Sequence, residues 1–255
     1  MDTRRYAVVR SPPGLRFWFP GLAQAELDEQ RQTLTVRPDP GAATGLVELL
    51  LGSMLAMILT VRGATILHAS AVSRGDRAIA VVGAEGGGKS TLAALLVRDG
   101  ARLVTDDVLR IGVEQFGVTW SRGTTDLRLR AHARQVALEP ALVSTPDGRW
   151  AQRAPLAHGD RGPLLAIILP RLARSPVPVT LERLTRARAL LGLAFAPRLR
   201  GLRDPDALRG QFQGLASVVR RIPVFEAQLP WGPPFAQNLG AQLCDALSSA
   251  GIDWW

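Results

Sequence analysis

The most informative part of this chain is the stretch Gly83-Ala84-Glu85-Gly86-Gly87-Gly88-Lys89-Ser90-Thr91. It fits the pattern G-x-x-x-x-G-K-[ST], in which glycines let a loop turn its backbone N–H groups toward one anion. The apolar run Ala78–Val82 precedes the stretch, and a helical pattern from Leu92 to Arg98 follows it and ends at Gly100. A buried strand, a glycine-rich loop and a helix N-terminus together form a phosphate site, so we predict a nucleotide-binding loop in an α/β protein.

The residues of this loop have different expected roles. Lys89 should reach the β- and γ-phosphates of a nucleotide, and the Ser90 hydroxyl should ligate Mg²⁺. Lys89 is the one lysine among 31 basic residues, and an arginine fork does not replace a compact ammonium in a tight phosphate pocket. Glu85 either tunes the metal site or faces solvent, and we expect it to face solvent. The predicted nucleotide contacts are Gly83, Gly86, Gly87, Gly88, Lys89, Ser90 and Thr91.

Two adjacent aspartates, Asp106 and Asp107, follow the predicted strand Arg102–Thr105. Ligands gather at the carboxyl ends of central strands in such sheets, so both carboxylates should lie beside the phosphate loop. One carboxylate can hold Mg²⁺, and one can accept the proton of a nucleophilic hydroxyl. Because adjacent side chains in a strand point to opposite faces, we expect the two to have different roles. A solvent-facing Asp-Asp turn is the alternative interpretation.

A histidine precedes the loop strand. His68 lies in the predicted strand Thr65–Val72, and the turn Ser73–Asp76 joins this strand to Ala78–Val82. A short turn makes the two strands neighbours, so His68 should lie in the strand beside the phosphate loop. The residues alone leave a structural and a catalytic role equally open for this side chain.

The rest of the chain predicts short strands and helices around this core. Residues 1–62 should form a β-rich segment with a helix packed on the core. Residues 63–255 should form the core with a C-terminal α/β extension, and we expect one compact unit. The strands expected are Arg5–Arg10, Leu15–Phe19, Gln32–Val36, Val108–Val113, Gly117–Trp120, Leu127–Leu129, Leu164–Leu169, Val177–Leu181 and Pro223–Leu229. The helices expected are Leu46–Val61, Ala131–Leu138, Arg183–Leu193, Pro205–Arg221 and Pro234–Ser248, with a loop at Thr145–Gly162.

The composition is that of an ordinary globular protein, with 47% apolar and 21% charged residues. It excludes a disordered chain, a coiled coil and a disulfide miniprotein, and the single Cys244 excludes an internal disulfide. The apolar run Leu46–Val61 is shorter than the roughly 20 residues that cross a bilayer. We therefore expect a buried core helix, no membrane partner and a cytoplasmic location.

The chain is strongly basic, with a formal net charge of +9. This charge suggests an acidic partner or a phosphate ligand, or else a codon bias toward arginine. The arginine-rich stretches Arg171–Arg188 and Arg198–Arg209 almost lack the aromatic residues on which bases stack. We interpret them as solvated helix faces or as a surface for an acidic peptide, and do not expect nucleic acid as a partner.

Three stretches together resemble the kinase core of HPr kinase/phosphorylase-related proteins: Leu67–Val72, Gly83–Thr91 and Val104–Asp107. That core is similar to phosphoenolpyruvate carboxykinase rather than to the ordinary P-loop kinases. The resemblance is close over Leu46–Arg130 and weak beyond it. It implies the α/β fold of the HPr kinase C-terminal domain with a central mixed sheet, ATP or another nucleoside triphosphate as phosphate donor, and Mg²⁺.

The resemblance also implies a role for each matching residue. Asp106 would be the base that acts on an acceptor serine, and Asp107 would support the metal and the lysine. The strand Asp126-Leu127-Arg128-Leu129 resembles a basic strand of the family, which makes Arg128 a phosphate contact. The implied catalytic residues are His68, Lys89 and Asp106, and the implied metal ligands are Ser90 and Asp107.

The chain departs from the bifunctional enzymes of that family at two places. Thr91 stands where they have an acidic residue, and Ser121-Arg122-Gly123 matches their Glu-x-Arg-Gly-Leu-Gly stretch poorly. The chain is more similar to stand-alone kinases found with ribosomally made peptides such as lasso peptides. This similarity implies phosphorylation of a serine on a precursor peptide or small protein, by an enzyme of a family that often forms homo-oligomers. A nucleotide-binding regulatory protein and a kinase of a small metabolite are the alternatives.

Overall fold

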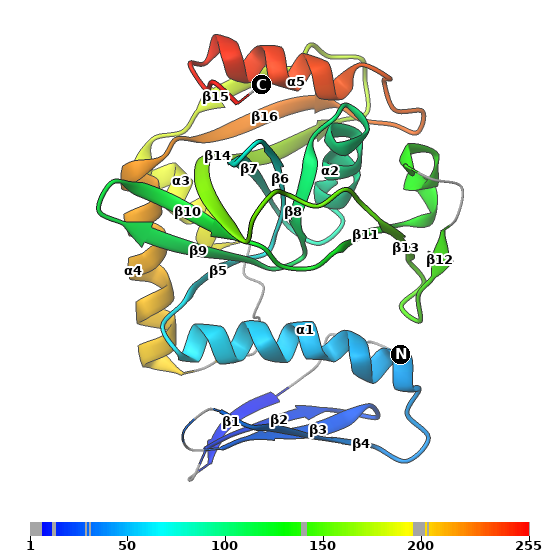
Figure 1. Cartoon of the computed structure of the whole chain (residues 1–255), viewed down its shortest axis with the longest axis vertical. Coiled ribbons are helices and arrows are strands. Elements are labelled where there is room, and N and C mark those ends of the chain that lie inside the picture. Colours follow the sequence, from blue (N-terminus) through cyan, green and yellow to red (C-terminus); the bar gives the residue numbers. More distant parts are fainter. Residues whose placement is uncertain are drawn as a thin grey trace.

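The computed structural model describes residues 7–11, 14–28, 30, 32–138, 142–195, 202 and 204–254. These residues form a mixed α/β protein (Figure 1). A large body is built around a curled mixed sheet, and a small antiparallel sheet lies beside it with the long helix α1 between the two.

The small sheet pairs four strands in chain order, each antiparallel to the next. They are β1 (Ala7–Ser11), β2 (Gly14–Phe19), β3 (Ala23–Leu27) and β4 (Leu34–Pro38). In β2, Phe17 and Phe19 are buried and Trp18 is exposed, which is the alternation of a strand with one covered face. The sequence does not predict β3, because Ala-Gln-Ala-Glu-Leu contains no β-branched or aromatic residue.

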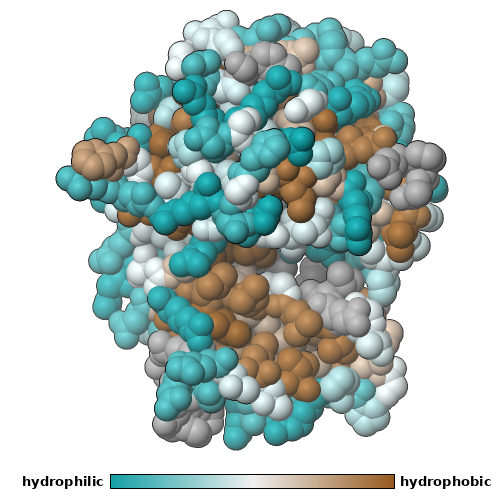
Figure 2. Space-filling model, in the orientation of Figure 1, coloured by the Kyte–Doolittle hydropathy of each residue, from teal (hydrophilic) through white to brown (hydrophobic). Residues whose placement is uncertain are grey.

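Helix α1 (Thr44–Val61) covers this sheet with one of its sides. Met54 and Met57 are fully buried in a core shared with the small sheet. Leu51 and Leu55 are 45% and 55% exposed, and Figure 2 shows apolar residues gathered on this face of the molecule. The expectation of a buried core helix therefore holds for one side only, because the large body contacts α1 through β5 and α4 and leaves these leucines exposed.

Within the described residues, α1 is the one helix long and apolar enough to cross a membrane by length and composition. It has 18 residues with a mean hydropathy of 1.9, and 44% of them are buried inside the structure. Core helices of soluble proteins meet the same criterion, so this observation is weak evidence.

The large sheet follows the order β5 (Thr65–Leu67), β9 (Leu109–Glu114), β10 (Gly117–Ser121), β14 (Arg161–Ala173), β7 (Arg77–Val82), β6 (Ala69–Arg74) and β8 (Arg102–Asp106). Strand β14 also pairs with β16 (Val224–Pro230), and β16 pairs with β15 (Thr180–Arg183). The β14–β7 and β14–β16 pairs are parallel, and the other pairs are antiparallel. The predicted mixed central sheet is confirmed.

Helices cover both faces of this sheet: α2 (Lys89–Arg98) and α5 (Leu239–Ser249) on one face, α3 (Arg186–Ala194) and α4 (Pro205–Arg221) on the other. The loop strand β7 therefore has two buried faces. Ile79 and Val81 pack with α2 and α5, whereas Ala80 and Val82 pack with α3 and α4. This double burial explains the continuous apolar run before the glycine loop.

The region after the aspartates differs from the prediction. Strands β11 (Asp126–Leu129), β13 (Trp150–Arg153) and β12 (Val143–Ser144) form a three-stranded antiparallel sheet, so part of the predicted loop Thr145–Gly162 is a strand. The predicted helix Ala131–Leu138 is a short 3₁₀ helix, η1 (Ala131–Val136). Helices α3 and α5 begin three and five residues later than predicted.

Strand β8 lies at the end of the strand order rather than in the middle of the sheet. Its outer edge is bonded by the following chain, because the Leu103 N–H donates to Pro155 O at 2.7 Å and the Ala157 N–H donates to Leu103 O at 2.8 Å. The expectation of a central strand is wrong here. As a consequence, Asp106, the last residue of β8, and Asp107, which follows it, lie beside the three-stranded sheet as well as the phosphate loop.

Candidate active site

The glycine loop connects β7 to α2 as the sequence predicts. Gly86 and Gly88 have φ angles of 78° and 80°, a conformation that other residues adopt only at a cost. A Cβ on Gly88 would also lie 2.5 Å from Cζ2 of Trp231. The loop closes on itself, since the Gly87 N–H donates to Ala84 O at 3.1 Å. The loop therefore requires glycine at position 88 for two independent reasons.

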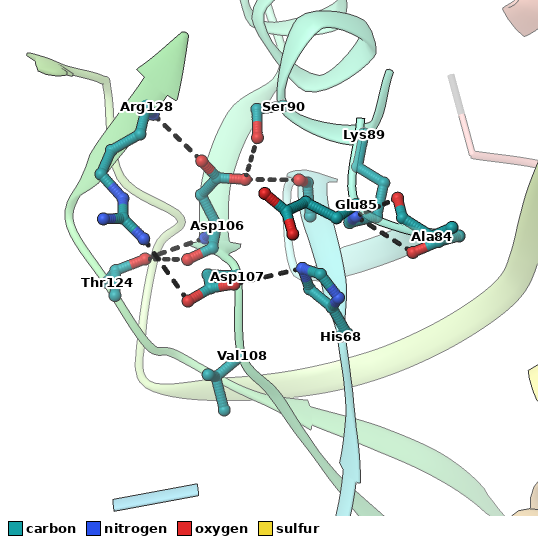
Figure 3. Close-up of polar contacts among 12 residues, drawn as sticks. His68, Ala84, Glu85, Lys89, Ser90, Asp106, Asp107, Val108, Thr124 and Arg128 are labelled. Carbon is teal, nitrogen blue, oxygen red and sulfur yellow. Dashed lines mark hydrogen bonds and ion pairs between the residues drawn. The ribbon is translucent and has the colours of Figure 1, made fainter. Parts of the chain in front are cut away.

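Lys89 folds back on its own loop. Its Nζ donates to Gly83 O at 3.0 Å and to Ala84 O at 2.9 Å (Figure 3). Burial lowers the pKa of this ammonium to about 8, although the carboxylates of Asp106 and Asp107 act in the opposite direction. The charge of Lys89 is therefore sensitive to pH in a range where most lysines stay protonated.

Asp106 is buried and accepts three hydrogen bonds. Its Oδ1 receives the hydroxyls of Ser70 at 2.5 Å and Ser90 at 2.8 Å, and its Oδ2 receives the Arg128 N–H at 3.0 Å. Its backbone is held by Thr124, whose Oγ1 accepts from Asp106 N at 2.9 Å. Figure 3 shows the carboxylate directed at the helix that begins with the phosphate loop.

Asp107 points in a different direction from its neighbour. Its φ of 94° lies in the left-handed region, where aspartate is among the few tolerated residues, and its N–H donates to Ala69 O at 3.0 Å. Its Oδ1 lies 3.2 Å from His68 Nε2, and its Oδ2 lies 3.5 Å from Arg128 Nη2. The two adjacent carboxylates share Arg128, through its backbone N–H and its guanidinium, and their other partners differ.

His68 lies at a junction between two strands. The predicted single strand Thr65–Val72 is in fact β5, which pairs with β9, and β6, which pairs with β7 and β8. The expected neighbour is correct, because Ala69 in β6 pairs with Val82 in β7. The change of partner at His68 turns its side chain to the Asp107 carboxylate in the cleft.

One cleft brings these residues together with others that the sequence does not point out. It is lined by His68, Glu85, Gly86, Gly88, Lys89, Ser90, Thr91, Asp106, Asp107, Arg128, Arg130, His132 and Arg149. Gly83 and Gly87 belong to the loop but do not line the cleft. Glu85 does not simply face solvent, since Arg130 and Arg149 contact its carboxylate.

The arginines were missed for a structural reason. Arg130 follows β11 and Arg149 precedes β13, and only the pairing of these two strands brings them to the phosphate loop. Arg130 stands two residues after Arg128, and this alternation in a basic strand is the one signal that could have identified it. Arg149 lies in the predicted loop and carries no comparable signal.

The donor set fits a magnesium ion better than a transition metal. Among the described residues, no group of three or more His, Cys, Asp or Glu side chains could hold a metal by itself. Mg²⁺ needs only one or two protein oxygens beside phosphates and water. Two such oxygens are available: the Ser90 hydroxyl in the first turn of α2 and the Asp106 carboxylate at the end of β8, which lie 2.8 Å apart.

Comparisons with known proteins give one kind of similarity. No family model matches the chain, and no curated protein matches it. Among solved structures, the chain is similar to the Hpr(Ser) kinase/phosphatase from Coxiella burnetii, with 14% sequence identity and a TM-score of 0.39. The alignment covers 74% of this chain and 97% of that one. A likeness at this level carries no argument about activity, which depends on the site residues.

Proposed function

We propose that this chain is an ATP- and Mg²⁺-dependent kinase that phosphorylates a serine hydroxyl. The observation that carries the proposal is the division of the Asp106–Asp107 pair. One carboxylate contacts Ser90 at the phosphate loop, and the other is turned to His68 in the same cleft. A phosphoryl transferase needs these two elements, a metal-side oxygen pair and a separate proton acceptor.

The contacts favour a division of roles opposite to the one implied by the family resemblance. Asp106 accepts hydrogen bonds from Ser70, Ser90 and Arg128, so both of its carboxylate oxygens already have donors. Of these donors, Ser90 is the expected metal ligand of the loop. We therefore assign the metal side to Asp106 and the proton acceptor to Asp107.

In this mechanism the oxygen of the acceptor hydroxyl forms a bond to the γ-phosphorus, and the Asp107 carboxylate takes the hydroxyl proton. The bond from the γ-phosphorus to the bridging oxygen of ATP breaks, and ADP keeps that electron pair. Lys89 and Arg128 stabilise the charge on the transferred group, and bound Mg²⁺ would neutralise charge on the β- and γ-phosphates. His68, 3.2 Å from Asp107, positions the accepting carboxylate.

The acceptor that we propose is a serine on a ribosomally made precursor peptide or small protein, of the lasso type or similar. The family resemblance of the sequence stretches supports this choice. The net charge of +9 is compatible with an acidic peptide as partner. ATP as the donor makes the cytoplasm the proposed location.

The test is phosphotransfer from γ-labelled ATP to three acceptors: a serine-containing acidic peptide, free serine, and none. The proposal predicts label in the peptide, with Mg²⁺ required and Lys89→Ala inactive. Label in free serine at comparable kcat/KM would show a small-metabolite kinase. Nucleotide binding with no transfer to any acceptor would contradict the kinase and favour a nucleotide-binding regulator.

A further inference from the structure

A carboxylate on the phosphate loop closes part of the cleft. Glu85 Oε1 lies 2.9 Å from Arg130 Nη2 and 3.4 Å from Arg149 Nη2, so two arginines share one oxygen. The arginines flank different strands of the three-stranded sheet: Arg130 directly follows β11, and Arg149 directly precedes β13. Figure 3 shows the Glu85 carboxylate turned into the site, and the cleft that it lines also includes Asp106 and Asp107.

This carboxylate has no role in holding phosphate. A negative charge on a phosphate loop repels the nucleotide that the loop binds. The loop N–H groups, Lys89 and the start of α2 already supply the donors that a nucleotide requires. Arg130 and Arg149 are therefore additional to those donors. Their counterion in this structure is Glu85, and Arg149 also contacts Asp147, whose Oδ2 lies 3.4 Å from Arg149 Nε.

The contact is easily exchanged. The side chains of Glu85 and Arg130 are 43% and 46% exposed, and ion pairs at this exposure contribute little to stability. Two converging arginines present a planar, multi-donor surface that suits an oxyanion such as a phosphate or a carboxylate. A doubly charged phosphate would outcompete the single charge of Glu85.

We propose that Arg130 and Arg149 form an oxyanion subsite beside the phosphate loop, and that Glu85 fills it until an anionic group takes its place. The ligand is a phosphate or carboxylate, supplied either by the terminal phosphate of the nucleotide or by an acidic group of the acceptor. The inference rests on the proposed function, because it adds an anion requirement to the same cleft.

The experiment is a calorimetric titration of inorganic phosphate into the protein saturated with Mg-ADP. Arg130→Gln should weaken phosphate binding about tenfold, since a charge-assisted hydrogen bond is lost, and the double variant with Arg149→Gln should weaken it further. Glu85→Gln should strengthen it severalfold, because the competing charge is gone. Arg153→Gln, an exposed position on β13 outside the cleft, is the matched control and should change nothing.

A second pair of titrations identifies the source of the anion. If Arg130→Gln weakens Mg-AMPPNP but not Mg-ADP, the subsite takes the terminal phosphate of the nucleotide. If both nucleotides bind as in the wild type while free phosphate binds more weakly, the subsite serves an acidic group of the acceptor. Phosphate affinity within twofold of wild type in Arg130→Gln, or no gain in Glu85→Gln, would overturn the subsite.

Failure of the subsite and failure of the kinase have different signatures. These titrations need no phosphotransfer. If the protein is inactive as a kinase but Arg130→Gln and Glu85→Gln still change its phosphate affinity as expected, the subsite is supported and the proposed function is contradicted. If the protein is an active kinase but neither substitution changes its affinity for phosphate, the proposed function stands and the subsite is contradicted. All the substituted side chains lie at least partly exposed in the cleft or on the surface, so the variants should fold.

Discussion

At the scale of single residues, Lys89 is a titrating group within the phosphate site. Its pKa of about 8 means that phosphate binding above this pH must take up a proton. The affinity for Mg-ADP should therefore be constant below pH 8 and fall by up to about tenfold per pH unit above it. Calorimetry across pH 6.5–9.5 measures this dependence. Since Lys89 is the only lysine, ε-¹³C-lysine labelling gives a single NMR signal that reports its pKa directly.

Lys89→Arg serves as the control for this dependence. A guanidinium stays protonated throughout the range, so the remaining nucleotide affinity of the variant should not vary around pH 8. Phosphotransfer should fall to a small fraction of the wild-type rate, because the planar fork cannot occupy the place of the ammonium between Gly83 O and Ala84 O. Near wild-type turnover in this variant would contradict the phosphate-loop assignment.

The two aspartates should give different phenotypes when each is changed to asparagine. Asp107→Asn removes the proposed proton acceptor and should lower kcat by about 10²–10⁴-fold while Mg-ATP still binds. Asp106→Asn should weaken Mg²⁺-dependent nucleotide binding, because it removes the carboxylate beside Ser90. Steady-state kinetics and nucleotide titrations with and without Mg²⁺ separate the two. Exchanged phenotypes would restore the roles that the family resemblance implies.

At the scale of elements, the phosphate loop depends on Gly88 more than on Gly86. Both have a positive φ, so an alanine at either costs about 1–2 kcal/mol. Only the Cβ at position 88 meets Trp231, whereas nothing lies within 4 Å of a Cβ at position 86. Gly88→Ala should therefore lower the free energy of urea unfolding at least about 1 kcal/mol more than Gly86→Ala.

Shortening the neighbour tests this cause directly. In the Trp231→Ala background, the difference between the two glycine variants should shrink, because the clashing ring is gone. An equal loss of stability in Gly88→Ala and Gly86→Ala with Trp231 present would show that the ring moves freely aside.

Helix α1 offers a matched pair of its own. Met57→Ala should lower the free energy of unfolding by about 2–5 kcal/mol, because it leaves a cavity in the core between α1 and the small sheet. Leu55→Ala changes a side chain that is 55% exposed and should cost less than about 1 kcal/mol. Urea unfolding measures both values. Equal losses would show that the exposed side of α1 is covered in solution.

At the scale of the whole molecule, the net charge of +9 should accelerate encounter with an acidic substrate peptide. The kcat/KM for such a peptide should fall steeply between about 50 and 500 mM salt, because the Debye length shortens over this range. A neutral peptide with the same serine is the control and should change little. A flat profile for the acidic peptide would show that the arginine content has no role in recognition.

The local pattern of the chain was sufficient for the phosphate loop and its supporting elements. The sequence Gly83–Thr91 places a loop between a doubly buried strand and a helix, and this is what the structure contains. Four predicted positions also meet at that loop: His68, beside the neighbouring strand, the divergent Asp106 and Asp107, and Arg128. The loop, the neighbouring strand and the position of the aspartates follow from short-range signals: turn residues, apolar runs and a motif of fixed spacing. Arg128 was identified only through the family resemblance.

Long-range pairing decided the rest. Strand β13 has no strand pattern of its own and exists because β11 and β12 bond to it, and this pairing alone brings Arg149 beside Arg130 and Glu85. Likewise, the side of α1 that is exposed depends on which elements of the large body pack against the helix, and these are β5 and α4. Local sequence signals were therefore enough to predict the phosphate loop and the candidates His68, Asp106 and Asp107 beside it. The tertiary structure decided the roles that their contacts favour and the arginines that complete the cleft, because contacts between distant segments leave no periodicity in either segment.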